Sequence, residues 1–207
     1  MILDVNRVKI INRIKLIIRI MSSEILVKNC SPTLAGIKTG NLFAVRCQGV
    51  ETIRKSVIEF NHKLVKKGVR IVPIFCQNGI VLIFVYRPIK LVKDFSHKLS
   101  SEILIKYGYN PQASNKCVVK LINRLKSGNG FPHEIGLFLG YPPADVYGFI
   151  KNNAKNYKCS GVWKVYENEE DAKKRFKAFK KCTSVYMNIL SKDNNCIEKL
   201  AVSLKNV

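Results

Sequence analysis

Two apolar runs joined by an Asn-Gly pair constrain the fold of this chain more than any other feature. Residues 69–76 and 80–86 are rich in β-branched and aromatic side chains, and Asn78-Gly79 lies between them. An Asn-Gly pair supplies the positive φ angles of a type I′ turn, so the two runs are predicted to form a β-hairpin. The second run is apolar at nearly every position, which predicts a central strand covered on both faces.

The elements around this hairpin follow from hydrophobic periodicity. Ser31-Pro32 is predicted to begin a helix, because a capping side chain followed by proline is typical of a helix start. The order of the elements predicts an α/β (α+β) fold, with a single mixed sheet of about five strands flanked by helices and a helical insert after the central hairpin. The other predicted elements are helices over 50–67, 93–106, 111–126 and 169–190, and strands within 34–45, 161–166 and 197–204.

The length of 207 residues suits one well-buried core and is short for two. No internal repeat or linker is present, so residues 21–207 are predicted to form a single globular domain. Residues 1–20 carry a basic side chain every few positions, which argues against both a membrane span and a signal peptide. We expect Met21 to be the natural start and residues 1–20 to be a non-functional extension, with weak membrane-surface binding as the alternative.

The formal charge of +22 at pH 7 has two explanations. Clustered basic residues would favour a polyanionic partner, nucleic acid above all. However, Lys predominates over Arg and is spread along most of the chain, as expected from an AT-rich genome. The charge alone therefore does not indicate a nucleic-acid-binding protein.

The cysteines indicate neither a disulfide framework nor a zinc site, because their number is odd and no pair has Cys-x-x-Cys spacing. Reduced, mostly buried thiols in a cytoplasmic protein are the simplest expectation. The seven are Cys30, Cys47, Cys76, Cys117, Cys159, Cys182 and Cys196.

Residues 130–150 combine glycines, prolines and a His-Glu pair in one short block. A short helix is predicted after Pro132 and is expected to end at Gly140, and Pro142-Pro143 is expected to begin the next helix, with Asp145 in its first turn. Gly136 and Gly148 each cost about 1 kcal/mol relative to Ala within a helix, so close approach of another helix or of a ligand is expected at both.

The same block resembles a DNA-binding helix-turn-helix in its spacing. Its second helix begins Pro-Ala-Asp and offers no Arg, Asn or Gln to base edges. A helical corner packed on the sheet is therefore the preferred interpretation, and DNA binding is the alternative.

Several long motifs resemble one bacterial family, the domain-of-unknown-function family 3793, which is found mainly in anaerobic Gram-positive bacteria. They are Cys-Ser-Pro-Thr-Leu-Ala-Gly-Ile-Lys-Thr at 30–39, Phe-Pro-His-Glu-Ile-Gly-Leu-Phe-Leu-Gly-Tyr-Pro at 131–142, and the segments 85–88 and 161–166. The resemblance covers about residues 22–202 and implies no activity. Members usually begin shortly before the first motif, which supports Met21 as the start. Many have His where this chain has Asn29, so no His-Cys metal site is expected here.

Candidate functional residues are few, and each has an ordinary structural alternative. Cys30, just before the expected helix start, would have a lowered thiol pKa, or would be a buried neighbour of the cap. His133 could act as a general base or ligand oriented by Glu134, or the two could be a surface pair. Further ligand-binding candidates are Lys38, Thr39, Asn41, Arg87, Trp163 and Tyr166, which could equally be surface charges or packing residues.

Three hypotheses of function follow. The first is a cytoplasmic small-ligand or cofactor-binding accessory protein, in which Cys30, Lys38, Arg87 and His133 converge on one pocket for an anionic molecule. The second is a thiol enzyme that uses Cys30 with His133 and Glu134. The third is a nucleic-acid-binding protein that uses the helical corner and the lysine surplus. The sequence indicates no particular cofactor, metal or oligomeric state.

Overall fold

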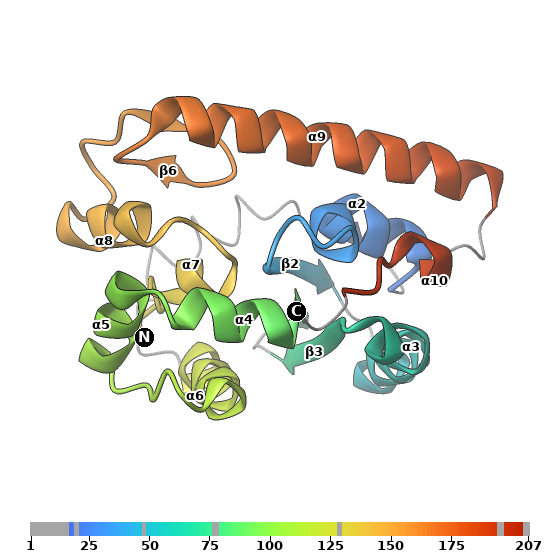
Figure 1. Cartoon of the computed structure of the whole chain (residues 1–207). Coiled ribbons are helices and arrows are strands. Elements are labelled where there is room, and N and C mark those ends of the chain that lie inside the picture. Colours follow the sequence, from blue (N-terminus) through green and yellow to red (C-terminus); the bar gives the residue numbers. More distant parts are fainter. Residues whose placement is uncertain are drawn as a thin grey trace.

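The computed structural model describes residues 17–18, 21–46, 49–75, 79–127, 130–193 and 197–204 (Figure 1). Its main sheet has the order β1-β2-β4-β3. β4 lies between β2 and β3 and is antiparallel to both, whereas β1 pairs in parallel with β2. The predicted hairpin and the central position of its second strand are therefore confirmed. The strands are β1 (Ile17–Ile18), β2 (Gly40–Arg46), β3 (Arg70–Phe75) and β4 (Ile80–Tyr86).

The sheet separates two hydrophobic cores. Successive side chains of a strand point to opposite faces, and β4 shows this directly. Val81, Ile83 and Val85 enter one core, with side chains of α2 (Ser23–Leu34) and α3 (Val50–Leu64). The alternate residues of β4 enter the other core, together with side chains of α4 (Pro88–Phe95), α5 (Lys98–Lys106), α6 (Ser114–Ser127) and α7 (Ile135–Phe138). Burial on both faces explains the almost continuous apolar sequence of this strand.

Most predicted helices are present. The segment 50–67 forms α3 followed by a short 3-10 helix, η1 (Val65–Lys67), and Gly68 ends it with a φ of 74°. The predicted helix over 169–190 is α9 (Glu169–Lys192). It runs above both α2 and the hairpin of β5 (Cys159–Ser160) and β6 (Lys164–Val165) (Figure 1). The predicted single helix over 93–106 is wrong, because Pro88 already begins α4 and the extended backbone of His97 separates α4 from α5.

The helix predicted to start at Ser31-Pro32 begins much earlier. Ser22 is the N-cap of α2, and its side chain accepts a hydrogen bond from the amide of Ile25 at 3.3 Å. Pro32 lies in the last turn of this helix. The earlier cap, together with Glu24 in the first turn, outweighs the Ser-Pro pair as a start signal.

The prediction of a single sheet of about five strands is also wrong, although the mixed α+β class is right. The segment 161–166 contributes only β6 (Lys164–Val165), which pairs with β5 (Cys159–Ser160) in a separate two-stranded sheet. Its side chains pack on α9 instead of the main sheet. The predicted final strand is the helix α10 (Ile197–Leu200), because Ile197, Leu200 and Ala201 are buried at helical spacing.

Some predictions fall on residues outside the described part. These include residues 1–16 and 19–20, Asn78 of the hairpin turn, and Cys47, Cys76 and Cys196. The other four cysteines are free thiols. Met21 is buried in the core beside α2. The non-functional extension and the single domain stay predictions.

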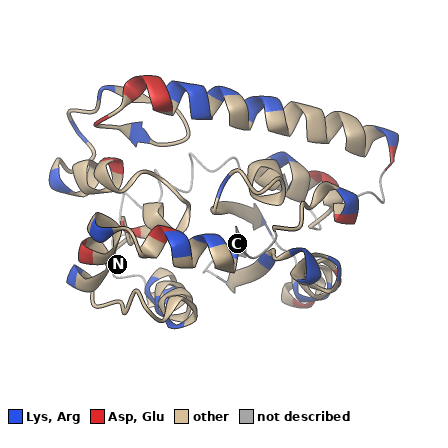
Figure 2. Ribbon diagram, viewed as in Figure 1, with Lys and Arg blue, Asp and Glu red and all other residues tan. Residues whose placement is uncertain are grey.

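Basic residues are spread over most of the described helices, with a marked series along the first half of α9 (Figure 2). Among the described residues, no helix is both long and apolar enough to cross a membrane. The exposed lysines of the α9 series are Lys173, Lys174, Lys177, Lys180 and Lys181.

Candidate functional site

The predicted helical corner is confirmed and packs closely against its neighbours. It consists of α7, a turn at Gly140 with a φ of 73°, and α8 (Pro143–Lys151). A Cβ atom at Gly136 would lie 2.7 Å from the Cγ2 atom of Val146, and one at Gly148 would lie 2.5 Å from the Cγ atom of Tyr166. These contacts are the close neighbours that the two helical glycines required.

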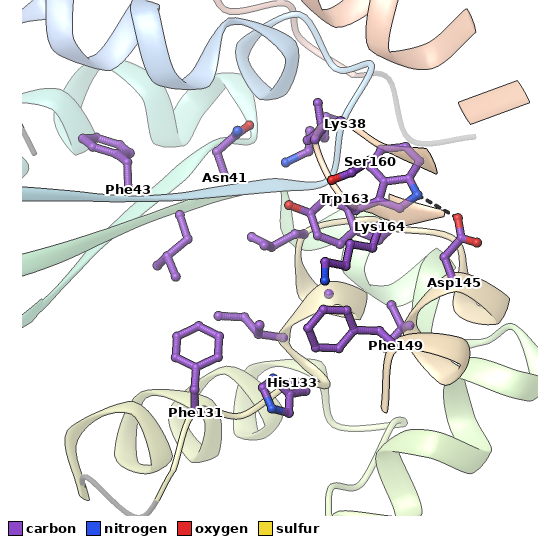
Figure 3. A pocket seen from close by; sticks show the side chains of 18 of the residues that line it. Lys38, Asn41, Phe43, Phe131, His133, Asp145, Phe149, Ser160, Trp163 and Lys164 are labelled. Carbon is purple, nitrogen blue, oxygen red and sulfur yellow. Dashed lines mark hydrogen bonds between the residues drawn. The ribbon is translucent and has the colours of Figure 1, made fainter. Parts of the chain in front are cut away.

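A cavity of about 780 Å³ lies where this corner meets β2 and the β5–β6 hairpin (Figure 3). One wall is made by Asn29 of α2, by Lys38 and by the first residues of β2. The opposite wall is made by the corner and by Phe131 before it. The hairpin segment from Ser160 to Lys164 closes the space beneath α9. Aromatic rings form much of the lining, from Phe43, Phe131, Tyr141, Phe149 and Trp163.

Lys38 is the most unusual residue of this lining. Its side chain is only 3% exposed, and its Nζ atom donates a hydrogen bond to the carbonyl oxygen of Gly40 at 2.6 Å. The same atom lies 5.2 Å from the centre of the Tyr141 ring. No carboxylate of the described residues pairs with it. Burial lowers the pKa of Lys38 to about 7; the thiol of Cys30 opposes this shift and the positive charge of Arg175 adds to it.

The hairpin wall is held in place by Asp145, at the start of α8. Its Oδ2 atom accepts a hydrogen bond from the indole Nε1 of Trp163 at 2.7 Å (Figure 3). Its Oδ1 atom accepts from the backbone amides of Tyr166 at 2.7 Å and Glu167 at 3.1 Å. Three donors thus satisfy this buried carboxylate, which lines the cavity but acts as an anchor for the hairpin.

The Trp163 ring packs against Tyr141, Phe176 and Arg175, and it also forms part of the cavity lining. Its ring centre lies 5.0 Å from that of Tyr141 and 4.5 Å from that of Phe176, the latter edge to face. The guanidinium carbon of Arg175 lies 4.9 Å from the indole ring, and the Nη2 atom of Arg175 donates to the carbonyl oxygen of Gly140. The ring is therefore a fixed, rigid part of the lining.

The lining also includes His133 and Lys164. His133 is exposed, and its ring centre lies 5.1 Å from that of Phe149 and 6.2 Å from that of Phe131. Lys164 is half-buried and donates from Nζ to the carbonyl oxygen of Ala154 at 2.5 Å. His133 and Lys164 thus place polar groups beside the Phe131 and Phe149 rings of the lining (Figure 3).

The structure brings together four of the predicted site residues: Lys38, Asn41, His133 and Trp163 all line the cavity. Asn41 accepts a hydrogen bond at its Oδ1 atom from the hydroxyl of Thr33 at 2.7 Å. The other candidates lie elsewhere. Thr39 donates its hydroxyl to Asp94, and Tyr166 lies under Gly148 with a buried hydroxyl that has no hydrogen-bond partner among the described residues.

The predicted convergence of Arg87 with Lys38 is wrong. Arg87 is completely buried away from the cavity, and its guanidinium donates to four backbone carbonyl oxygens. The acceptors belong to Thr33 at 2.6 Å, Leu34 at 2.6 Å, Lys67 at 3.0 Å and Val202 at 2.7 Å. Each guanidinium nitrogen makes at least one of these hydrogen bonds, and four of the five N–H groups are used, so Arg87 stabilises the fold at a place that does not line the cavity.

Cys30 and Glu134 also fail to reach the cavity. Cys30 lies inside α2 instead of before a helix start, so the predicted lowering of its pKa by a helix N-terminus is wrong; burial raises the pKa of this thiol, although the charge of Lys38 opposes the shift. Glu134 is buried and accepts hydrogen bonds from Tyr109 and Arg124. The His133-Glu134 pair is thus divided between a cavity and a core, and these placements oppose the thiol-enzyme hypothesis.

The alternative of DNA binding by the corner finds no support in the placement of α8. Asp145 and Val146 in its first turns are buried, and Tyr147 is the exposed residue between the two buried positions 146 and 148. Nucleic-acid binding by the basic surface stays an untested prediction.

Sequence reasoning missed three residues that line the cavity or support its lining: Asp145 and Lys164 line it, and Arg175 contacts Trp163 from α9. The sequence predicts the position of Asp145 in a first turn, but nothing in the sequence indicates that its carboxylate holds a hairpin about twenty residues away. Arg175 is one basic residue among many in α9, so only tertiary contacts distinguish it. For Lys164, the sequence does offer a signal: it follows Trp163 directly, inside the recognisable motif at 161–166. In addition, the described residues contain no group of three or more potential metal ligands of the His, Cys, Asp or Glu type.

The fold and this lining define a class of protein: an α+β protein with an aromatic-lined, partly open cavity and a buried lysine in its wall. The chain belongs to the domain-of-unknown-function family 3793, whose family model, described as a protein of unknown function, matches residues 26–201. No curated protein and no solved structure matches the chain. The matched range contains every residue that lines the cavity.

Proposed function

We propose that this protein binds a small, flat, ring-containing molecule that carries an acidic group, in the cavity lined by Lys38 and Trp163. We place it in the cytoplasm, because its cysteine spacing suits a reducing compartment. The observation that carries the proposal is the buried amino group of Lys38, which lines the cavity with no carboxylate partner among the described residues.

The energetics of a buried cation favour an anionic ligand. Removing an ammonium group from water is unfavourable unless a counter-charge or several hydrogen bonds replace the lost hydration. Lys38 has one carbonyl acceptor and a π face, which explains why its pKa falls to about 7. A bound carboxylate or phosphate would supply the missing partner and would raise the pKa of Lys38 again.

The shape and lining of the cavity favour a ring system. The volume of about 780 Å³ lies within the range of roughly 300–1,000 Å³ that is typical of small-molecule sites. Each favourable ring contact contributes about 0.5–1.5 kcal/mol beyond area burial. The one carboxylate of the lining, Asp145, is already satisfied by three donors and therefore repels an acidic ligand less than an unpaired carboxylate would.

Trp163 offers a direct measurement, because it is the only tryptophan of the chain and faces the cavity. We expect para-hydroxybenzoate to change its fluorescence saturably, and the uncharged para-hydroxybenzyl alcohol to do so at least about tenfold more weakly. The variant Lys38→Met should lose this preference for the acid. Lys180→Met, at an exposed position of α9, is the matched control and should keep it. Equal responses to acid and alcohol in the wild-type protein would overturn the proposal.

The pH dependence gives a second test. Lys38 is mostly cationic below its pKa of about 7 and mostly neutral above it. The carboxylate of the probe is ionised throughout this range. The affinity for para-hydroxybenzoate should therefore fall as the pH rises from 6 to 8.5, and the fall should disappear in Lys38→Met. An absorbance spectrum of the freshly purified protein would show whether a coloured cofactor such as flavin or haem is bound.

A further inference from the structure

We propose that the neutral form of Lys38 also reacts, forming a reversible covalent imine with the carbonyl group of a ring-containing aldehyde; in this complex the imine takes the place of the ammonium–carboxylate pair. This inference rests on the proposed function, since it assigns the chemistry of the same cavity.

The geometry presents the amine as a nucleophile. Lys38 lines the cavity wall, and in Figure 3 its amino nitrogen lies beside the start of β2, on the side of Asn41. A neutral amine donates one N–H to the carbonyl oxygen of Gly40, 2.6 Å away, and its nitrogen lone pair then points in another direction. No carboxylate of the described residues holds this nitrogen in its charged form. The Tyr141 ring, 5.2 Å away, limits the positions that the amine can occupy.

The ionisation of Lys38 agrees with this role. Because burial lowers its pKa to about 7, about half of the molecules carry a neutral amine at neutral pH. An exposed lysine with a pKa near 10.4 is neutral in only about one molecule in 2,500 at the same pH. A desolvated lysine is the form of this side chain that serves in Schiff-base chemistry.

The reaction needs no oxidant or metal. The Nζ lone pair attacks the carbonyl carbon of the aldehyde and forms a carbinolamine. This intermediate then loses water, in which the former carbonyl oxygen leaves with both hydrogens of the amine, and a carbon–nitrogen double bond remains. The reverse step is hydrolysis, so enclosure of the bound ring would favour the imine by limiting the access of water.

Lys164 is the internal comparison, because it lines the same cavity. Its Nζ atom lies 4.3 Å from the centre of the Tyr157 ring and is hydrogen-bonded to Ala154. We assign the covalent step to Lys38 because Lys164 is only half-buried. A ligand in the cavity can approach either lysine, so the extent of covalent modification at each one tests whether Lys38 is the reactive residue.

The test traps the imine by reduction. The full chain is incubated at pH 7 with para-carboxybenzaldehyde and cyanoborohydride, digested, and mapped by mass spectrometry. We expect Lys38 to be modified at least about tenfold more than Lys164 or the average exposed lysine. An excess of para-hydroxybenzoate, which has no aldehyde, should protect Lys38. At pH 5.5, modification of Lys38 should fall by roughly 15-fold, because the neutral fraction falls by that factor.

The possible results separate the two proposals. If para-hydroxybenzoate binds in a Lys38-dependent way but the aldehyde leaves Lys38 unmodified, the imine is excluded and the binding site stands. If exposed lysines are modified as much as Lys38, the imine is likewise overturned. If neither probe responds to Lys38, both proposals fail. The modified lysine is mapped in the wild-type protein, so the result does not depend on whether a variant folds. Lys38→Arg is an additional control and should give no adduct at this position.

Discussion

Lys38 and Arg87 are both buried cations, and they differ in how their N–H groups are used. The planar guanidinium of Arg87 donates to four carbonyl oxygens, an arrangement that suits its fixed fork of donors. The amino group of Lys38 has one carbonyl acceptor and lines a cavity. At the residue scale, hydrogen-bond satisfaction therefore separates a structural cation from a functional candidate.

Lys38→Met should change how stability depends on pH. The pKa of Lys38 is about 7 in the folded protein and about 10.4 in the unfolded chain, so the unfolded chain binds more protons between these values. This residue therefore makes the free energy of unfolding rise with pH, by up to about 1.4 kcal/mol per pH unit. Urea titrations of both proteins between pH 6 and pH 8.5 should show the variant lacking this rise. Parallel pH profiles for the two proteins would show that Lys38 titrates normally.

At the element scale, the corner and the β5–β6 hairpin are defined by close contacts between backbone and side chains. Gly136 lies against Val146 within the corner, and Gly148 lies against Tyr166 from the hairpin. Asp145 adds three hydrogen bonds between α8 and the hairpin. The cavity wall therefore depends on contacts between elements more than on the helix propensity of either segment.

Gly136→Ala should destabilise the protein even though alanine favours helices. The added Cβ atom would lie 2.7 Å from the Cγ2 atom of Val146, and overpacking of this kind costs about 1–3 kcal/mol. Val146→Ala removes the two methyl groups that a Cβ at Gly136 would meet. In a double-mutant cycle measured by urea unfolding, the combined variant should therefore lose less stability than the sum of the two single variants. Simple additivity would contradict the proposed clash.

Asp145→Asn should loosen the hairpin. An amide group keeps one acceptor oxygen, but its NH₂ group faces donors in place of an acceptor, so at least one hydrogen bond is lost at a cost of about 1–3 kcal/mol. We expect the Trp163 emission to shift to longer wavelength as the indole becomes more exposed. Asp171→Asn, at an exposed position in the first turn of α9, should leave the emission unchanged. An unchanged spectrum in Asp145→Asn would show that other contacts hold the wall.

At the scale of the whole molecule, one residue connects segments that are far apart in the sequence. Arg87, at the end of β4, joins the end of α2, the end of η1 and the C-terminal segment after α10. The amide of Val202 also donates to the carbonyl oxygen of Leu34 at 3.0 Å. The C-terminal segment is thereby fixed against α2, on the same side of the sheet as the core formed with α3.

Arg87→Met should therefore be among the most destabilising substitutions in the chain. Four carbonyl oxygens would lose a charged donor in a buried site, and we expect a loss of at least about 3 kcal/mol in the free energy of unfolding. Arg46→Met, at the exposed end of β2, is the matched control and should cost less than about 0.5 kcal/mol. Ligand binding at the cavity should survive in any folded fraction of Arg87→Met, since Arg87 does not line it.

Features that depend on interactions between residues near in sequence could be predicted, and features that depend on contacts between distant segments could not. Local patterns predicted the hairpin, the central strand, the long α9 helix and the corner, because turn chemistry and periodicity act over a few residues. They failed at Ser31-Pro32 and at the C-terminal segment, where an earlier cap and burial at helical spacing decided the structure. Of the site, Lys38, Asn41, His133 and Trp163 were named from sequence and line one cavity, whereas Asp145 and Arg175 were missed as contributors.

The sequence by itself determined the family, the α+β class and the residues of the helical corner, since each of these depends on local pattern or on recognisable motifs. Only the tertiary structure decided which charged side chains are structural and which line the cavity. In the sequence, Lys38, Arg87 and Glu134 are all charged residues within recognisable motifs, and nothing local distinguishes their roles. The physical difference is the number of partners that the folded backbone offers to each: four carbonyl oxygens for Arg87, two side-chain donors for Glu134, and one carbonyl oxygen with an open cavity for Lys38.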